Sequence, residues 1–148
     1  DDPTRYLLAI VSGSTDLGEI TDACPSTTVT FHVGDPFYYG NKRRVEVKAG
    51  TFTVNAGGNR PAHLAITAKP SSSAAWYIRN VDTGEQVKLA SSVTSTSTVR
   101  VDMALERATV NSQAAAVTLD SDFFTINGRT TLQLSGGSAV LEWRERWL

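Results

Sequence analysis

The sequence lacks the features that define several classes of protein. Its 148 residues include one cysteine, Cys24, so neither an internal disulfide nor a cysteine metal cluster can form. We expect this thiol to pack as a small apolar group. The longest apolar runs, such as residues 6–11, fall far short of the ~20 residues that cross a bilayer. Fourteen basic and fifteen acidic side chains give a net charge of -1 without a basic stripe for phosphate binding. Membrane and nucleic-acid partners are therefore not expected.

Length and composition predict one globular domain, or one domain that carries a short piece of a neighbouring domain. Hydrophobic residues make up 41% and charged residues 20% of the chain, as is typical of folded soluble proteins. The first residues, Asp1–Pro3, include no methionine and no signal-peptide pattern. We therefore expect the sequence to begin inside a longer gene product.

Helical periodicity is also missing, and strand periodicity replaces it. The clearest run is 28–33, where Val29, Phe31 and Val33 point to one side and predict a strand with one buried face. The same alternation recurs in Val45/Val47, Phe52/Val54, Leu64/Ile66, Val87/Leu89, Val99/Val101/Met103, Val117/Leu119, Leu132/Leu134 and Leu141/Trp143. About nine such strands require two sheets or a barrel. The sequence therefore predicts an all-β fold, an antiparallel β-sandwich, with a hint of a helical turn only at 104–108.

Turn residues separate the predicted strands. Asp82-Thr83-Gly84 predicts a hairpin, and Asn127-Gly128 and Gly136-Gly137 predict two further turns, because asparagine and glycine tolerate positive φ. The serine- and threonine-rich run 91–98 has the composition of a linker, but its β-branched residues favour an exposed or edge strand. The basic cluster 42–44 suits the protection of another sheet edge.

A domain junction is predicted at residues 34–40, which have a glycine at each end. Pro36 moves Asp35 out of the helical region and favours a turn. Residues 1–34 hold two predicted strands, too few to bury a core, whereas 41–148 hold enough for a domain. The division is therefore 1–40 and 41–148. The candidate junction residues are Asp35, Pro36, Tyr39 and Gly40.

The motifs that suggest catalysis have simpler structural interpretations. The Asp82 triplet matches that of aspartic proteases, but polar neighbours indicate an ordinary turn. Residues 120–122 are too few for a calcium loop, and two isolated histidines, His32 and His63, make no zinc site. We expect no enzyme activity, no metal and no cofactor.

Aromatic residues are the remaining candidates for binding. Alternation places Trp76 and Trp143 in the core. Tyr77 and Trp147 remain available for contacts with sugars or proteins. A carbohydrate-binding module is therefore the alternative to an assembly protein.

Seven short segments occur in a characteristic order from about residue 27 to the end. They are FHVGDPFYYG (31–40), VNAGGNRP (54–61), VDTGEQVKL (81–89), VRVD (99–102), FFTING (123–128), LQL (132–134) and VLEWRERW (140–147). In this order they resemble the distal tail proteins of long-tailed, siphovirus-type bacteriophages and related prophage tail components.

The resemblance implies a structural protein of the virion tail, assembled in the bacterial cytoplasm. Six copies would form a ring that joins the tail tube to the tip or baseplate, so the implied partners are other copies and other tail proteins. Residues 1–40 would be the end of the ring-forming domain and a linker, with the last strands in 1–34 and the junction at 35–40. Residues 41–148 would form an outward sandwich of jelly-roll, galectin-like type. The galactoside motifs of true galectins are absent: His32 is followed by Val33-Gly34-Asp35, and the segment after Trp143 lacks the required glycine. Another surface would have to bind host-wall carbohydrate.

Overall fold

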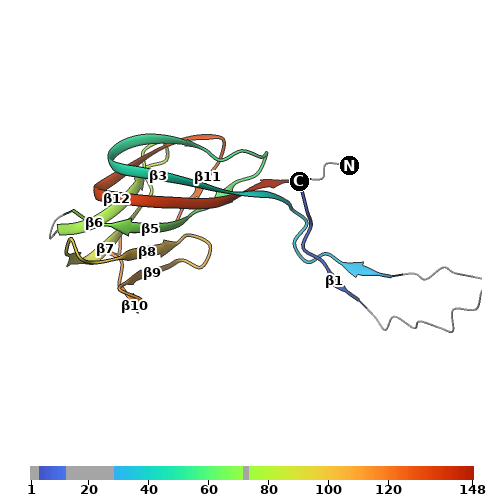
Figure 1. The fold of residues 1–148 in the computed structure, drawn as a ribbon, viewed down its shortest axis with the longest axis horizontal. Coiled ribbons are helices and arrows are strands. Elements are labelled where there is room, and N and C mark those ends of the chain that lie inside the picture. Colours follow the sequence, from blue (N-terminus) through green and yellow to red (C-terminus); the bar gives the residue numbers. More distant parts are fainter. Residues whose placement is uncertain (1–3, 13–28, 72–73) are drawn as a thin grey trace, which may run out of the picture.

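The computed structural model describes residues 4–12, 29–71 and 74–148, and these ranges contain strands and turns but no helix. Figure 1 shows a β-sandwich from which a thin arm projects. The arm consists of residues 4–12 and 29–33 and contains two short strands. The strands are β1 (Ile10–Val11), β2 (Phe31–His32), β3 (Tyr38–Asn55), β4 (Ala62–His63), β5 (Ala65–Lys69), β6 (Ala74–Asn80), β7 (Gln86–Val93), β8 (Val99–Asp102), β9 (Arg107–Val110), β10 (Gln113–Ala114), β11 (Thr125–Ile126) and β12 (Arg129–Trp147). The predicted all-β sandwich is confirmed.

Two long strands, β3 and β12, form the frame of the sandwich. They pair antiparallel from Arg129 opposite Asn55 to Trp147 opposite Tyr38. The first part of β12 also pairs with β6, whereas the part after residue 137 pairs with β5. These strands form one eight-stranded sheet, in the order β10-β9-β8-β5-β12-β6-β7 with β3 beside β12. The exchange of β6 for β5 along β12 divides it into two facing sheets.

The core lies between these two sheets and contains most of the predicted apolar positions. Its largest fully buried side chains are Trp76, Phe124, Leu64, Ile66, Ile78, Leu89, Ile126, Leu132, Leu134, Leu141, Val87 and Val99. Burial of each large apolar side chain stabilises the fold by about 1.5–3 kcal/mol. Trp143 is also buried, and its indole N–H donates a 2.8 Å hydrogen bond to the Ala56 carbonyl. The predicted burial of Trp76 and Trp143 is confirmed.

The Asp82 triplet forms the predicted hairpin between β6 and β7. The Gly84 N–H donates to the Asn80 carbonyl at 2.8 Å, and Gly84 has a φ of +85°. The Asp82 carboxylate accepts a 2.7 Å hydrogen bond from the Thr131 N–H, which ties the hairpin to β12. The aspartate therefore serves the turn and the sheet. The Asn127-Gly128 turn is likewise present, between β11 and β12.

The prediction of a turn at Gly136-Gly137 is wrong. Both glycines lie inside β12, at the irregularity between Leu134 and Ser138 where the strand exchanges β6 for β5. Gly137 has a φ of +81°, and its backbone lies against Lys69. The glycine pair is a bend within one strand, because the positive φ is used to change sheets instead of reversing the chain.

The prediction of a long, half-buried strand at 28–33 is also wrong for the described part. Residue 28 lies outside the described residues, as does Cys24, and β2 covers only Phe31–His32. Phe31 is 61% exposed, and its partner strand β1 carries Ile10, which is 68% exposed. Alternation was correct as a sign of extended chain, but no second layer covers these side chains within the described residues.

Two smaller expectations fail for local reasons, and a third, the edge strand at 91–98, is met only in part. Val117 makes only an isolated bridge to Leu89, and Leu119 lies fully exposed in a turn. The predicted helical turn at 104–108 is the end of the β8–β9 hairpin, where the Asp102 carboxylate accepts hydrogen bonds from the next backbone N–H groups. The run 91–98 ends β7 and then turns, and within it Val93 and Ser97 are buried.

β3 is an edge strand, as predicted for the basic cluster 42–44. Among the described residues its pairing partner is β12, apart from a single bridge between Tyr39 at its start and Tyr6. Lys42, Arg43 and Arg44 are exposed on it and make ion pairs with Glu142, Glu145 and Glu46 respectively. Charged side chains on such an edge disfavour pairing with a further strand. β3 begins at Tyr38, inside the predicted linker, and the division at 40/41 stays a prediction.

Candidate functional site

The arm joins the sandwich at a cluster of aromatic and arginine side chains. Tyr6, from the arm, and Tyr39, from β3, exchange two backbone hydrogen bonds of 3.0 and 2.8 Å. Their rings stack at 6.0 Å between centroids. The Tyr39 hydroxyl donates a short hydrogen bond to the Asp35 carboxylate. The predicted junction turn is therefore fixed to both the arm and the first long strand.

Arginines near the end of β12 cover these rings. The Arg146 guanidinium carbon lies 4.1 Å from the Phe37 ring centroid and 5.7 Å from that of Tyr39. Arg144 lies 5.6 Å from the Tyr6 ring centroid. Cation–π contacts of this kind are each worth about 0.5–1 kcal/mol at exposed sites and more when desolvated. Together they attach the arm to the last strand.

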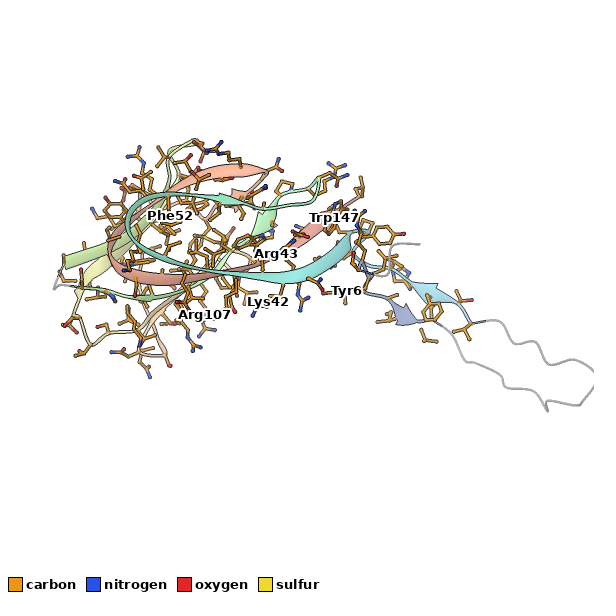
Figure 2. All side chains as sticks on the ribbon, turned by 45° about the horizontal axis from the view of Figure 1, so that its top comes forward. Tyr6, Lys42, Arg43, Phe52, Arg107 and Trp147 are labelled. Atoms are coloured by element: carbon orange, nitrogen blue, oxygen red, sulfur yellow. The ribbon has the colours of Figure 1, made fainter. Side chains whose placement is uncertain are left out.

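Trp147 closes the cluster on the other side. Its ring lies directly over Gly40, so that a β-carbon at Gly40 would be 2.7 Å from Cζ3 of the indole. The Arg5 guanidinium carbon is 4.2 Å from the Trp147 ring centroid. Figure 2 shows Tyr6 and Trp147 where the arm meets the sandwich. Trp147 is thus half-buried and in contact with the junction, and only part of its ring is free for a ligand.

The loop 56–61 holds the end of β12 in place. The N–H groups of Asn59 and Arg60 donate to the Arg146 carbonyl at 3.0 and 3.2 Å. The Arg146 guanidinium donates to the Pro61 carbonyl at 3.3 Å. Gly58 has a φ of +74° and lies against the Arg146 backbone, where a side chain would collide. The loop is the predicted connection between two strands, and its glycines permit this close approach.

A charge pair connects the same strand end to β3. The Arg43 Nε donates a 2.8 Å hydrogen bond to Glu145, whose side chain is 15% exposed. Burial and the neighbouring Asp35 carboxylate raise the pKa of the Tyr39 hydroxyl above its usual value of 10.0, and Arg146 opposes this rise. Tyr39 therefore remains a neutral donor at any physiological pH.

An open groove of about 450 Å³ lies beside the junction, lined by Tyr39, His63, Asp102, Glu142 and Arg144 among others. Its acidic and basic groups are mixed, and Lys42 and Glu142 pair at 2.9 Å. No three histidine, cysteine, aspartate or glutamate side chains gather as a metal site anywhere in the described ranges. No helix there is long and apolar enough to cross a membrane. Mixed charge on an open surface suits contact with a protein.

The structure brings three of the four predicted junction residues into this cluster. Asp35 and Tyr39 are hydrogen-bonded, and Gly40 is buried under Trp147, whereas Pro36 is exposed in the turn. Tyr77 lies elsewhere: it belongs to β6, and its N–H donates to the Ser135 hydroxyl at 2.9 Å. Tyr77 and Trp147 therefore do not form one site, since β6 pairs with the opposite end of β12.

Sequence reasoning missed the other half of the cluster. Tyr6, Arg144 and Arg146 were not singled out, because each contacts residues far away in the sequence. The available signal was the ending Trp-Arg-Glu-Arg-Trp, where charged and aromatic residues alternate at the end of an apolar strand.

Comparison with known proteins gives the family. Residues 57–147 match the sequence profile described as the siphovirus-type tail component, C-terminal domain, of the SPP1 Dit type. The chain belongs to this family. The protein is therefore a component of the virion tail. No curated protein sequence matches it significantly.

A solved structure shares the fold. The tail component is similar to the SPP1 Dit protein, whose crystal structure is described as a paradigm of the hub adsorption apparatus in phages that infect Gram-positive bacteria. The TM-score is 0.79 at 19% sequence identity, and the match covers 99% of this chain. The chain spans 62% of the length of that protein. The galectin-like sandwich expected from the resemblance is confirmed.

Proposed function

We propose that this tail component is a non-catalytic hub protein, which forms a ring of identical subunits between the tail tube and the tip or baseplate. The observation that most supports this proposal is the fold that the chain shares, over 99% of its length, with a protein described as a hub of an adsorption apparatus. The sandwich projects from the ring and contacts other tail proteins. The junction cluster keeps the sandwich at a fixed orientation to the ring-forming part.

The arm supports this proposal. Leu8, Ile10 and Phe31 are all more than half exposed on it. Neighbouring apolar side chains at such exposure mark a surface that is covered by protein in an assembly. The arm is therefore a surface for contact with another protein of the tail.

The experiment is the absolute mass of the full gene product, measured by light scattering after size exclusion over a wide range of concentration. A mass of six chains supports the ring. Deletion of the gene in the phage, followed by electron microscopy of tails, provides the second readout, and the expected result is tails without an assembled tip. Monomers at all concentrations together with intact tails in the deletion would contradict the proposal.

Recognition of host-wall carbohydrate by Tyr77 and Trp147 has less support. The two aromatic side chains lie on different parts of the sandwich, and Trp147 is engaged by Arg5 and Gly40. Titration of tryptophan fluorescence with host-wall polysaccharide tests this alternative. A flat response at saturating polysaccharide would exclude it.

A further inference from the structure

A single leucine projects from the sandwich on a rigid turn, residues 118–122. Leu119 is fully exposed, more than any other large apolar side chain described. The turn beneath it is tied to β7: the Asp122 N–H donates to the Gln86 carbonyl at 2.8 Å, and the Lys88 N–H donates to the Ser121 hydroxyl at 3.1 Å. The leucine is therefore presented by an ordered backbone, which lowers the entropic cost of docking it.

Two carboxylates follow this leucine in the turn. Asp120 follows it directly, and its Oδ2 accepts a 2.9 Å hydrogen bond from the Gln86 amide. Hydrogen bonds, the largest from the Thr118 hydroxyl, hold the pKa of Asp120 below its usual value of 3.8. Asp122 lies two residues further on, at the end of the turn. The turn thus offers an apolar tip with negative charge beside it.

A groove with complementary properties lies on the outer face of the other sheet. It has a volume of about 410 Å³, and its lining includes Thr67 from β5, Arg100 from β8, Arg107 and Thr109 from β9, and Leu105 from the hairpin between them. Leu105 is 71% exposed. The groove therefore combines an apolar contact surface with two guanidinium groups, and the carboxylates of Asp102 and Glu142 also line it. Figure 2 shows Arg107 on the outside of the sandwich, on the same side as Lys42.

The two arginines of the groove are available for a partner. Arg100 is opposite Thr109 and Arg107 is opposite Asp102 in the β8–β9 register, so the two arginines are diagonal neighbours on one face. Neither makes an ion pair within 4.0 Å in the described ranges. The Asp102 carboxylate instead accepts hydrogen bonds from Ala104 and Leu105 N–H groups.

We propose that the 118–122 turn of one copy docks into this groove of a second copy, with Leu119 against Leu105 and with Asp120 and Asp122 facing Arg100 and Arg107. The proposal rests on the proposed ring, and it names a contact through which neighbouring sandwiches interact. The turn and the groove are different surfaces of the same chain, so the contact is heterologous, as a closed ring requires. The two carboxylates that also line the groove already have partners: Glu142 pairs with Lys42 at 2.9 Å, and Asp102 accepts the hydrogen bonds from the Ala104 and Leu105 N–H groups. Arg100 and Arg107 therefore remain for the carboxylates of the turn.

The test uses two variants of the whole chain that disable opposite halves of the contact. Leu119→Asp removes the apolar tip, and Arg100→Ala/Arg107→Ala removes the positive groups of the groove. Val81→Asp is the matched control for the first, because Val81 is an exposed apolar residue in another turn. Arg79→Ala/Arg129→Ala is the control for the second. Circular dichroism and the fluorescence of the buried tryptophans verify that each variant folds.

The readout is the mass by light scattering at high protein concentration. We expect the wild type and both controls to associate, and each test variant alone to be monomeric. An equimolar mixture of the two test variants has one intact turn and one intact groove, so we expect it to form dimers that do not extend. Association of the test variants equal to that of the wild type would overturn this contact and leave the proposed ring standing. A monomeric wild type would also overturn the contact, whereas the ring is decided separately by the mass of the full gene product.

Discussion

Gly40 is the residue on which the junction packing depends most directly. A β-carbon there would lie 2.7 and 2.8 Å from two ring atoms of Trp147, so Gly40→Ala must displace the indole. We expect a loss of about 1–3 kcal/mol in the free energy of unfolding, as for other overpacked sites. Gly34→Ala is the control, because nothing lies within 4 Å of its added carbon. Chemical denaturation monitored by tryptophan fluorescence measures both. Equal stability of the two variants would contradict this packing.

Tyr39 makes the junction sensitive to alkaline pH. Burial is the main cause that raises the pKa of its hydroxyl above 10.0, and the hydrogen bond to Asp35 raises this pKa further. The tyrosine hydroxyl holds its proton more tightly in the folded chain than in the unfolded chain. Its contribution to the free energy of unfolding is therefore fully present below pH 10 and is lost as the pH rises through the pKa of the folded state. We expect the phenolate absorbance to show one late-titrating tyrosine in the folded chain.

Two conservative variants test that assignment. Tyr39→Phe is expected to abolish the late titration, because it removes the hydroxyl that donates to Asp35. Tyr38→Phe is expected to retain it, because Tyr39 keeps its hydroxyl in that variant. Persistence of the late titration in Tyr39→Phe would assign it to another residue.

Among the strands, β12 depends on its central glycine pair. At Gly137 the φ of +81° and the distance of 2.8 Å from an added carbon to Pro70 leave no room for a side chain. We expect Gly137→Ala to lower the free energy of unfolding by about 2 kcal/mol or more, through strain and collision together. The neighbouring Gly136→Ala meets only the Ser71 hydroxyl at 3.3 Å and is expected to cost less. Thermal unfolding of both variants checks the order, and the reverse order would place the bend elsewhere.

The same glycine pair shows what a sequence can and cannot predict about strands. Alternation identified the buried pairs of β8 and β12 correctly, because one covered face imposes a period of two. A glycine pair has the same local signature in a hairpin and in a bend, and only the contacts with β5 and β6 distinguish them. Phe31 alternates equally well, but the described part of the chain supplies no layer to cover it.

At the level of the whole molecule, the junction could be predicted in part. The local turn identified Asp35 and Gly40 through backbone preferences that act over a few residues. The contacts of Tyr6 and Arg146 with Tyr39 join distant parts of the chain, and no pattern within one segment encodes them. Half of the site was therefore accessible from sequence, and the other half required the fold.

This division of the molecule predicts the result of removing the arm. Every buried core residue in the described ranges lies at position 54 or later, so a chain of residues 35–148 keeps this core together with Asp35 and Tyr39. We expect it to unfold cooperatively with unchanged β-sheet circular dichroism.

The shortened chain should also bind less of a hydrophobic dye than the whole chain, because the exposed side chains of Ile10 and Phe31 are gone. Trp147 loses Arg5 in this variant, so its fluorescence should change while that of the buried tryptophans does not. The double variant Ile10→Ser/Phe31→Ser in the whole chain is the control, since it should reduce dye binding and leave Trp147 unchanged. Loss of cooperative unfolding in 35–148 would show that the sandwich needs the arm to fold.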